Sequence, residues 1–361
     1  MASKRIYNVA IVGYGYWGPN LMRNFMHSVN FTVAYLVDTA PAALNSFQVS
    51  YPNVAITTSI DVVLEDDGVD AVVIASPPKS HYNLAKQAVL KGKHVFVEKP
   101  FTTSFEEASE IIELADKHAL KVFVDYTFLF HGAIGTIRQI IQDKLKFGEL
   151  LYIDSVRINL GIFQSDVNVV WDLACHDIAI FNYLLDDLPL AVQAVGIDGL
   201  GNGNENISYI HLKYKNKFAQ INCSWSSPVK IRRMLIGGNR QAILYNDIEP
   251  TDKIKVYNKG VVFDTEDKRN EILQDYRTGE VFIPKYDTTE ALKNVVCGFY
   301  DALTDAGESR GDGQAALLTT FILEMIQKSI ILGGKELEID WRQVGPSLYS
   351  YITSKGMLNQ Q

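Results

Sequence analysis

The apolar positions of the first 125 residues fall alternately into short continuous runs and into longer stripes with helical spacing. A short continuous run of β-branched and aromatic residues is typical of a parallel strand buried on both faces. Such runs occur at Tyr7–Val12, Thr32–Val37, Ala71–Ile74, His94–Val97 and Val122–Asp125. Helical patterns lie between them, notably at Ser80–Lys91 and Phe105–His118. This alternation predicts an α/β domain over residues 1–125, with a doubly wound parallel sheet of the Rossmann type.

The pattern changes after about Tyr126. Alternating apolar and polar positions without intervening helices predict strands at Leu151–Leu160, Ser208–Tyr214, Phe218–Ser226 and Ile231–Ile236. Helical stretches are predicted at Ala133–Lys144, Ala174–Leu185, Glu290–Leu303 and Gln314–Ile331, and a hairpin loop at Gly199–Asn206. We therefore expect a second α+β domain over residues 126–361, with a large, mostly antiparallel open sheet covered on one face.

Composition narrows the classes of partner. The net charge is −8 and no basic block occurs, which argues against nucleic acid and against an anionic membrane surface. No apolar run approaches the length of a membrane span, and the start of the chain lacks the pattern of a signal peptide. The 3 cysteines are widely spaced, without a metal-ligand rhythm. We expect a cytoplasmic protein without a metal site.

Gly13-Tyr14-Gly15-Tyr16-Trp17-Gly18 is a G-x-G-x-x-G motif between the first predicted strand and a predicted helix. The first glycine permits a tight turn, the second lets a pyrophosphate approach the backbone, and the third allows close packing of helix on strand. The amino end of the helix then faces the anion. At the first strand-to-helix turn this motif predicts a dinucleotide site that includes Tyr16 and Trp17.

Four further residues belong to this predicted cofactor site. Asp38 ends the second strand, where a carboxylate accepts hydrogen bonds from ribose hydroxyls and repels a 2′-phosphate, so NAD is favoured over NADP. A turn or N-cap role is the competing interpretation of Asp38. Ser76 and Pro77 close the third run and precede His81, which either borders the cofactor or serves as a structural residue in the first turn of a helix.

Glu98-Lys99-Pro100 follows the strand at His94–Val97. In open α/β sheets ligands bind beyond the carboxyl ends of the strands. A lysine at that edge is placed for proton transfer, and we assign these three residues to the cofactor site and Lys99 to catalysis as well.

Asp172 and His176 are four residues apart, which places them on one face if a helix begins there. A carboxylate beside an imidazole fixes its tautomer and raises its proton affinity, so both are candidate catalytic residues. An N-cap with a packed histidine is the competing interpretation. Asp177 is adjacent to His176 and is expected to point elsewhere, into a structural hydrogen bond.

The second domain also offers candidate substrate-binding residues. Aromatic faces suit a sugar ring or a nucleobase, although ordinary core packing explains them as well. A basic cluster in Lys230-Ile231-Arg232-Arg233 suits a diphosphate, or else a solvated strand edge. The candidates are Tyr126, Arg157, Asn159, Phe163, Trp171, Lys230 and Arg232.

The glycine motif, Ser76-Pro77, Glu98-Lys99-Pro100 and the Asp172–His176 pair occur in the order and with the separations of a known group. The chain resembles the glucose–fructose oxidoreductase, inositol dehydrogenase and MocA-like family over nearly its whole length. The resemblance implies that Lys99 lies beside the nicotinamide and that His176, accompanied by Asp172, is the second acid–base group. It also implies a cis peptide bond before Pro100, and a homodimer or homotetramer formed through the second sheet.

Within that family the chain looks most similar to members that act on nucleotide-linked sugars. The resemblance implies hydride transfer at C3 of a UDP-N-acetylhexosamine or its uronic acid, in surface-polysaccharide or modified-sugar biosynthesis. Three alternatives stay open at this point: a dehydrogenase of a free polyol or sugar, an NAD-dependent glycosidase with transient C3 oxidation, and a non-catalytic nucleotide sensor.

Overall fold

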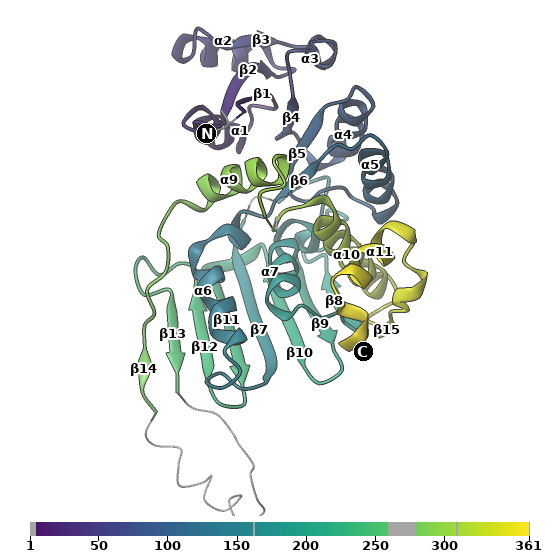
Figure 1. Cartoon of the computed structure of the whole chain (residues 1–361). Coiled ribbons are helices and arrows are strands. Elements are labelled where there is room, and N and C mark those ends of the chain that lie inside the picture. Colours follow the sequence, from purple (N-terminus) through teal and green to yellow (C-terminus); the bar gives the residue numbers. More distant parts are fainter. Residues whose placement is uncertain (1–4, 162, 259–278, 308–309, 361) are drawn as a thin grey trace, which may run out of the picture. The chain divides into compact units, whose positions relative to one another are not determined.

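The computed structural model describes residues 5–161, 163–258, 279–307 and 310–360, which fall into two compact units (Figure 1). The first unit consists of Met1–Phe130, Glu290–Phe321 and Gly345–Tyr351. The second consists of His131–Thr289, Ile322–Val344 and Ile352–Gln361. Each unit is therefore built from several separate segments of the chain. The assignment of dinucleotide binding to residues 1–125, and of substrate binding and oligomer formation to residues 126–361, stays a prediction.

The first unit is built on a six-stranded parallel sheet with the order β3-β2-β1-β4-β5-β6. This is the strand order of a doubly wound dinucleotide-binding sheet, and its topological switch point lies between β1 and β4. The strands are β1 (Tyr7–Val12), β2 (Phe31–Val37), β3 (Ala55–Thr57), β4 (Ala71–Ile74), β5 (His94–Glu98) and β6 (Val122–Asp125). The predicted fold of this region is confirmed, with the short strand β3 as an addition.

Helices connect the strands of the first unit and contribute to its core. They are α1 (Gly18–Met26), α2 (Pro41–Ser50), α3 (Ile60–Leu64), α4 (His81–Leu90), α5 (Phe105–Lys117) and α9 (Ala291–Leu303), with the short helices η1 (Pro78–Ser80) and η2 (Thr127–Phe130). Phe299 of α9 stacks on Phe31 of β2 at 5.6 Å and meets Phe96 of β5 edge-on at 5.4 Å. Because of these aromatic contacts, a segment after residue 290 completes the core of the first unit.

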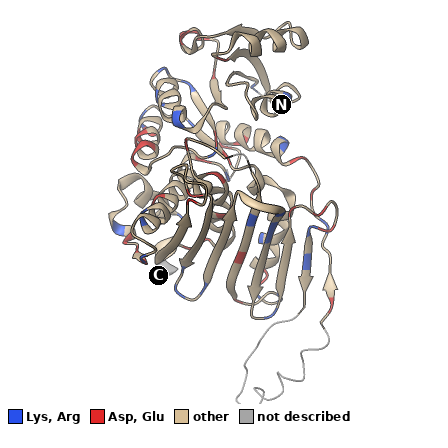
Figure 2. Ribbon diagram, turned by 180° about the vertical axis from the view of Figure 1, so that it is seen from behind, with Lys and Arg blue, Asp and Glu red and all other residues tan. Residues whose placement is uncertain are grey.

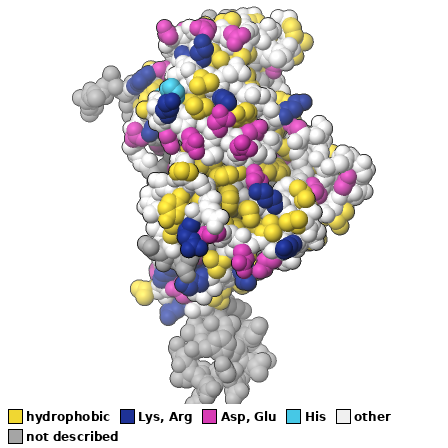
Figure 3. All heavy atoms as spheres, turned by 90° about the vertical axis from the view of Figure 1, so that its right-hand side faces the viewer, with side chains coloured by type: hydrophobic (Ala, Val, Ile, Leu, Met, Phe, Trp, Pro, Cys, Tyr) yellow, Lys and Arg dark blue, Asp and Glu magenta, His cyan; other side chains and the backbone are white. Residues whose placement is uncertain are grey.

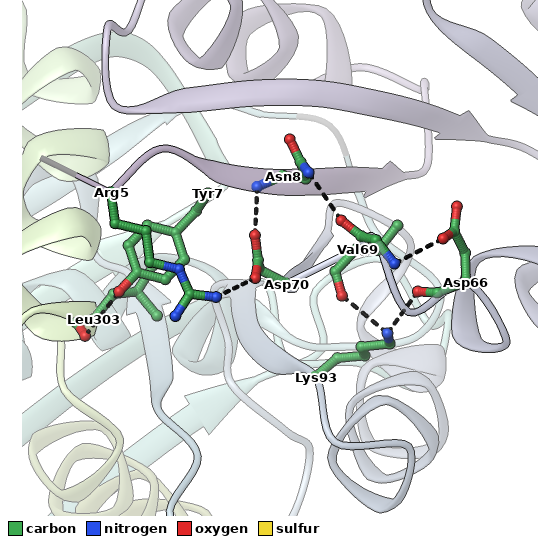
Figure 4. Close-up of polar contacts among 9 residues, drawn as sticks. Arg5, Tyr7, Asn8, Asp66, Val69, Asp70, Lys93 and Leu303 are labelled. Carbon is green, nitrogen blue, oxygen red and sulfur yellow. Dashed lines mark hydrogen bonds and ion pairs between the residues drawn. The ribbon is translucent and has the colours of Figure 1, made fainter. Parts of the chain in front are cut away.

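Polar contacts tie together the amino-terminal edge of this sheet (Figure 4). The buried Lys93 ammonium, just before β5, donates to the carbonyl oxygens of Asp66 at 2.7 Å and Val69 at 2.9 Å. Asp70, just before β4, accepts from the backbone N–H of Asn8 at 2.8 Å and from the Arg5 guanidinium. These side chains form hydrogen bonds with backbone groups at or just before the starts of the strands. The predicted cofactor site lies at the other edge of the sheet, where the strands end.

The second unit is built on a nine-stranded sheet with the order β14-β13-β12-β11-β7-β10-β9-β8-β15. Among the described strand pairings of this second sheet, only the β10–β7 pair is parallel. The strands are β7 (Leu150–Leu160), β8 (Ala191–Ile197), β9 (Ile207–Lys213), β10 (Phe218–Ser224), β11 (Ser226–Gly238), β12 (Ala242–Asn246), β13 (Ile254–Tyr257), β14 (Val281–Phe282) and β15 (Leu337–Glu338). The predicted, mostly antiparallel open sheet is confirmed, and the predicted loop Gly199–Asn206 connects the hairpin β8–β9.

Helices α6 (Gly132–Gln142) and α7 (Cys175–Leu185) lie over one face of this sheet (Figure 1). Helices α10 (Gly313–Ile331) and α11 (Pro346–Ser354) each have residues in both units, and the short helices η4 (Trp341–Gln343) and η5 (Met357–Gln360) complete the second. Figure 2 shows the strands from the opposite side. Strand β9 alternates buried and more exposed residues, as a sheet covered on one face requires.

None of the helices within the described ranges is long and apolar enough to cross a membrane.

Candidate active site

The glycine loop of the first unit has the geometry that its motif predicts. Gly13 has φ +100°, and a Cβ there would lie 2.7 Å from the carbonyl oxygen of Ala75. A Cβ on Gly18, the first residue of α1, would lie 2.4 Å from the carbonyl oxygen of Gly13. A Cβ on Gly15 would meet nothing within 4 Å. Gly13 and Gly18 are thus required by packing, whereas Gly15 leaves open space for a ligand to approach the backbone.

Asp38 is fixed beside this loop at the end of β2. Its Oδ2 accepts from the backbone N–H of Tyr14 at 2.7 Å, and its Oδ1 accepts from the backbone N–H of Ala40 at 2.8 Å. A carboxylate has about four acceptor positions, so these two bonds leave capacity for ribose hydroxyls. Ala40, rather than Asp38, is the N-cap residue of α2. The loop and Asp38 together fit a dinucleotide.

Tyr16 and Trp17 of the loop differ in exposure. Tyr16 is 84% exposed, and its ring stacks on that of Trp17 with centroids 6.4 Å apart. Trp17 is half-buried and is the N-cap residue of α1. Their predicted contacts with the cofactor stay predictions.

His81 joins the loops that follow β4 and β5. Its ring is fully buried, with Nδ1 2.8 Å from the carbonyl oxygen of Pro100 and Nε2 2.8 Å from the carbonyl oxygen of Ser76. Ser76 Oγ lies 2.6 Å from Ser80 Oγ, and Pro77 is exposed. His81 therefore holds the backbone of both loops in place at the carboxyl edge of the sheet.

Lys99 follows β5 directly, and the Lys99–Pro100 peptide bond is cis, as the family resemblance implied. Strands β1, β4 and β5 are consecutive parallel neighbours, so the glycine loop, Ser76 and Lys99 follow strands whose carboxyl ends meet at one edge. Lys99 is half-buried and Pro100 is buried.

Two buried carboxyl groups adjoin Lys99. Glu98 of β5 and Asp125 of β6 are register partners, with exposures of 8% and 0%. Burial, followed by the charge of Asp125, raises the pKa of Glu98 well above its usual value. Burial also raises the pKa of Asp125, although hydrogen bonds from Glu98 and Thr127 oppose the shift. The hydroxyl of Thr127 donates to Asp125 Oδ1 at 2.8 Å.

In the second unit, Asp172 lies in a π-helical turn, η3 (Val170–Ala174), that runs into α7. The sequence predicted a regular helix start, and the single π turn, a form frequent at functional sites, is a correction. Asp172 Oδ2 accepts from the indole N–H of Trp225 at 2.9 Å, and Oδ1 accepts from Gln164 at 3.3 Å. His176 belongs to the first turn of α7, and both residues are largely buried, at 9% and 6% exposure.

Arg157 forms a buried ion pair with Asp177. Asp177 Oδ2 accepts from Arg157 Nε at 2.7 Å, and Oδ1 accepts from Nη2 at 3.0 Å and from the Ser155 hydroxyl at 2.9 Å. Burial lowers and the Asp177 charge raises the pKa of Arg157, and the net shift is upward. The predicted structural hydrogen bond of Asp177 is confirmed. The pair anchors α7 on β7, and a role of Arg157 toward a substrate stays a prediction.

The structure places the other substrate candidates of the sequence at varied depths. Tyr126 and Trp171 are buried, Asn159 is half-buried at the end of β7, and Phe163 is partly exposed with its ring 5.8 Å from that of Trp225. Arg232 pairs in register with Arg157 and lies 3.9 Å from Asp247, while Lys230 and Arg233 are exposed. Arg232 and Arg233 are successive residues of β11, so they point to opposite faces of the sheet, and Arg233 does not belong to one cluster with Arg232.

Sequence reasoning did not select Trp225, Gln164 or Asp125. Trp225 and Gln164 contact Asp172 from other segments of the chain, so no short sequence motif around Asp172 predicts these contacts. Asp125 could have been predicted from the sequence, because it ends the strand that lies next to the strand of Glu98. Adjacent parallel strands bring their last residues together.

Comparison with known proteins agrees with this geometry. Residues 7–126 match the family model described as "Oxidoreductase family, NAD-binding Rossmann fold", which is the glucose–fructose oxidoreductase, inositol dehydrogenase and MocA group. This segment belongs to that family of oxidoreductases, and the predicted resemblance is confirmed. The dinucleotide-binding class of the domain is thereby shown, without distinguishing NAD from NADP.

Two relatives are informative. UDP-N-acetylglucosamine 3-dehydrogenase of Acidithiobacillus ferrooxidans is 34% identical over 140 residues, which is 38% of this chain and 42% of that protein. Its solved structure covers 90% of this chain and 97% of its own, with a TM-score of 0.76 and 21% identity. The solved structure of GenD2 from gentamicin A biosynthesis, in complex with NAD, has a TM-score of 0.78 and 18% identity, covering 93% of this chain and 97% of its own.

These structural likenesses show the fold alone. The sequence matches to three curated oxidoreductases span only 28%, 37% and 42% of those proteins' lengths.

Proposed function

We propose that the protein is an NAD(H)-dependent oxidoreductase acting on a secondary alcohol or ketone of a sugar, at C3 of a UDP-N-acetylhexosamine or its uronic acid. Its product would enter surface-polysaccharide or modified-sugar biosynthesis. The observation that carries the proposal is the carboxyl edge of the first sheet. There the open backbone at Gly15, the anchored Asp38 and the lysine after β5 follow strands of one parallel sheet.

The residues of the first unit have separate proposed tasks. The glycine loop binds the pyrophosphate, and Asp38 accepts from the ribose and disfavours a 2′-phosphate, which favours NAD over NADP. The bound nicotinamide supplies the two-electron acceptor or donor for the interconversion of alcohol and ketone. Lys99 accepts the hydroxyl proton on oxidation and returns it on reduction.

The residues of the second unit supply the other proposed acid–base group. His176 serves as proton shuttle or polarising donor, and Asp172 acts with it. The Trp225 indole and the Gln164 amide both donate to Asp172, and these bonds fix the orientation of its carboxyl group.

The support for a nucleotide-linked sugar is the similarity to UDP-N-acetylglucosamine 3-dehydrogenase. The dispersed positions of Lys230, Arg232 and Arg233 favour a second candidate, a dehydrogenase of free polyols or sugars, because such a substrate needs no diphosphate site.

Absorbance of reduced dinucleotide separates these functions. Wild type, Lys99→Ala and Asp38→Asn proteins are mixed with NAD⁺ or NADP⁺ and with UDP-N-acetylhexosamines, their uronic acids and free polyols. Lys117→Ala, which changes an exposed lysine of α5, is the matched control. We expect signal with NAD⁺ and a UDP-sugar, retained in Lys117→Ala and lost in Lys99→Ala. We also expect Asp38→Asn to narrow the preference for NAD⁺ over NADP⁺.

Signal with free polyols alone would support the second candidate. Release of a sugar from a glycoside without net reduction of dinucleotide would instead support an NAD-dependent glycosidase. Unchanged signal in Lys99→Ala would contradict the role given to this lysine.

A further inference from the structure

We propose that Glu98 and Asp125 share one proton and together hold a single negative charge beside Lys99, which sets the proton affinity of that lysine. Glu98 and Asp125 are then positioning residues that act through Lys99. The inference rests on the proposed function only for its consequence in catalysis, since the shared proton is a property of the folded protein itself.

The first argument is geometric. Glu98 and Asp125 end adjacent parallel strands as register partners, and both are buried. Each of the two carboxyl groups shifts the pKa of the other through their mutual interaction. Two ionised carboxylates in contact inside a protein repel strongly, and a single shared proton removes that repulsion.

The second argument concerns hydrogen-bond donors. Glu98 Oε1 and Asp125 Oδ2 are buried oxygen atoms without a well-formed hydrogen bond from the described residues. The Trp17 indole lies close enough to lower the pKa of Asp125, but its N–H also lacks a well-formed hydrogen bond. Asp125 Oδ1 receives the Thr127 hydroxyl, so the remaining oxygen is the one that needs a donor. A carboxylate cannot donate, whereas a carboxylic acid can. A proton on Glu98, donated to Asp125, satisfies both oxygens at once.

The third argument is the charge around the pair. The Lys99 ammonium lowers the pKa of both carboxyl groups, after the larger effects of burial and of their mutual contact. Electrostatic coupling is reciprocal, so a negative charge on the pair favours the ammonium form of Lys99. Thr127 donates a neutral hydrogen bond to Asp125, the neutral Trp17 indole lowers the pKa of Asp125, and His81 on α4 contacts the Pro100 carbonyl oxygen.

Amide variants distinguish the possible charge states. In Glu98→Gln or Asp125→Asn, the remaining carboxylate ionises and accepts from the new amide, so the pair keeps one negative charge. In the double variant the pair is neutral. If wild type holds one charge, the single variants leave the pKa of Lys99 in place and the double variant lowers it by about 1 unit. If wild type holds two charges, each single variant already lowers it.

Two measurements need no substrate and so remain informative if the proposed function fails. Infrared difference spectra of wild type against each single variant at neutral pH report a protonated carboxyl group. The pH dependence of Lys99 acylation, followed by peptide mass spectrometry, reports the pKa of the lysine, with Lys117 as an internal reference on α5. Circular dichroism establishes that each variant is folded.

We expect one protonated-carboxyl band that is lost in both single variants, and a Lys99 midpoint that moves only in the double variant. Absence of the band from wild type would overturn the proposal. A Lys99 midpoint that moves in each single variant, or that stays unchanged in the double variant as well, would also overturn it. With active enzyme, the pH profile of kcat is expected to follow the Lys99 midpoint in all four proteins.

Discussion

At the scale of single residues, Asp172 illustrates how a candidate catalytic group depends on a distant partner. Its carboxylate is held by the indole of Trp225, which is 1% exposed and follows β10. A hydrogen bond to a charged group contributes about 1.5–3 kcal/mol, so its loss costs the carboxylate both orientation and stabilisation. The proton chemistry proposed for the second unit therefore depends on Trp225 as well.

Replacing Trp225 by Phe is expected to lower kcat about tenfold or more, which corresponds to about 1.4 kcal/mol. Trp341→Phe is the matched control, because its buried indole donates to the carbonyl oxygen of Pro189 at 2.7 Å in the same unit. Thermal unfolding and steady-state kinetics are measured for both. Both variants lose stability, but only Trp225→Phe loses activity; equal kinetics in the two variants would refute the positioning role.

Glu98 gives a pH prediction with a definite sign. Its pKa is raised by burial and by Asp125, so the folded protein binds a proton that the unfolded chain releases above its ordinary value of 4.5. Stability then falls as pH rises above that value, by at most about 1.4 kcal/mol per pH unit.

Glutamine cannot ionise, so Glu98→Gln is expected to become more stable relative to wild type between pH 5 and pH 8. Urea unfolding at both pH values tests this, with Glu106→Gln as the exposed control on α5. A difference between Glu98→Gln and wild type that is the same at both pH values would contradict the raised pKa.

At the scale of elements, the glycine loop separates folding from binding. The close approach of Gly18 to the Gly13 carbonyl oxygen fixes α1 against the loop after β1, whereas Gly15 borders open space. Gly18→Ala is expected to lower the melting temperature by several degrees through this backbone clash. Gly15→Ala is expected to keep the melting temperature and to weaken dinucleotide binding at least tenfold.

Thermal scans with and without NAD⁺ test both variants together, because a ligand that binds only the folded state raises its melting temperature. If Gly15→Ala bound NAD⁺ as tightly as wild type, the pyrophosphate would not approach the backbone there.

The elements that the sequence predicted are those with strong patterns. Buried runs such as Tyr7–Val12 and Val122–Asp125 are strands with the predicted bounds, because short runs rich in β-branched and aromatic residues leave few alternatives. The two-residue strands β14 and β15 were not predicted, since two residues show no period. The π turn at Asp172 was also missed, because one extra residue in a helical turn leaves the spacing of apolar residues almost unchanged.

Only those site residues that can be recognised from their immediate sequence neighbours could be predicted. Gly13, Asp38 and Lys99 follow strands, and strand ends can be located from the apolar pattern. Trp225 reaches Asp172 through tertiary structure, and the burial that sets the charge of Glu98 comes from the packing of whole elements. Both depend on contacts that one sequence does not display.

At the scale of the whole molecule, charge is dispersed. Figure 3 shows acidic and basic side chains interspersed over one face, in keeping with a net charge of −8 and no basic block. Such a surface gives no extended positive field, so a phosphate-bearing substrate has to be bound by local donors such as backbone N–H groups. This favours the glycine loop as the main anion site of the first unit.

The second sheet carries large exposed apolar residues, including Tyr152, Val195, Ile197, Tyr209 and Phe218, with exposures of 39% to 59%. Tyr152 pairs in register with Phe218, and Val195 with Tyr209. Exposed apolar pairs on a sheet face are typical of an interface, and the homodimer or homotetramer stays a prediction.

Tyr209→Lys is expected to lower the molar mass measured by light scattering toward that of one chain. Leu145→Lys, at an isolated leucine that is 85% exposed, should not. A monomeric wild type would contradict the predicted assembly.

The most direct test of the central claim is a single turnover with NAD⁺ and UDP-N-acetylglucosamine that carries deuterium at C3, followed by mass spectrometry of the dinucleotide and of the sugar. We predict that the deuterium is recovered in the dinucleotide with wild type and with Lys117→Ala, and that Lys99→Ala slows its transfer by several orders of magnitude. Deuterium that stays on the sugar with wild type, or transfer that is unaffected in Lys99→Ala, would contradict the account.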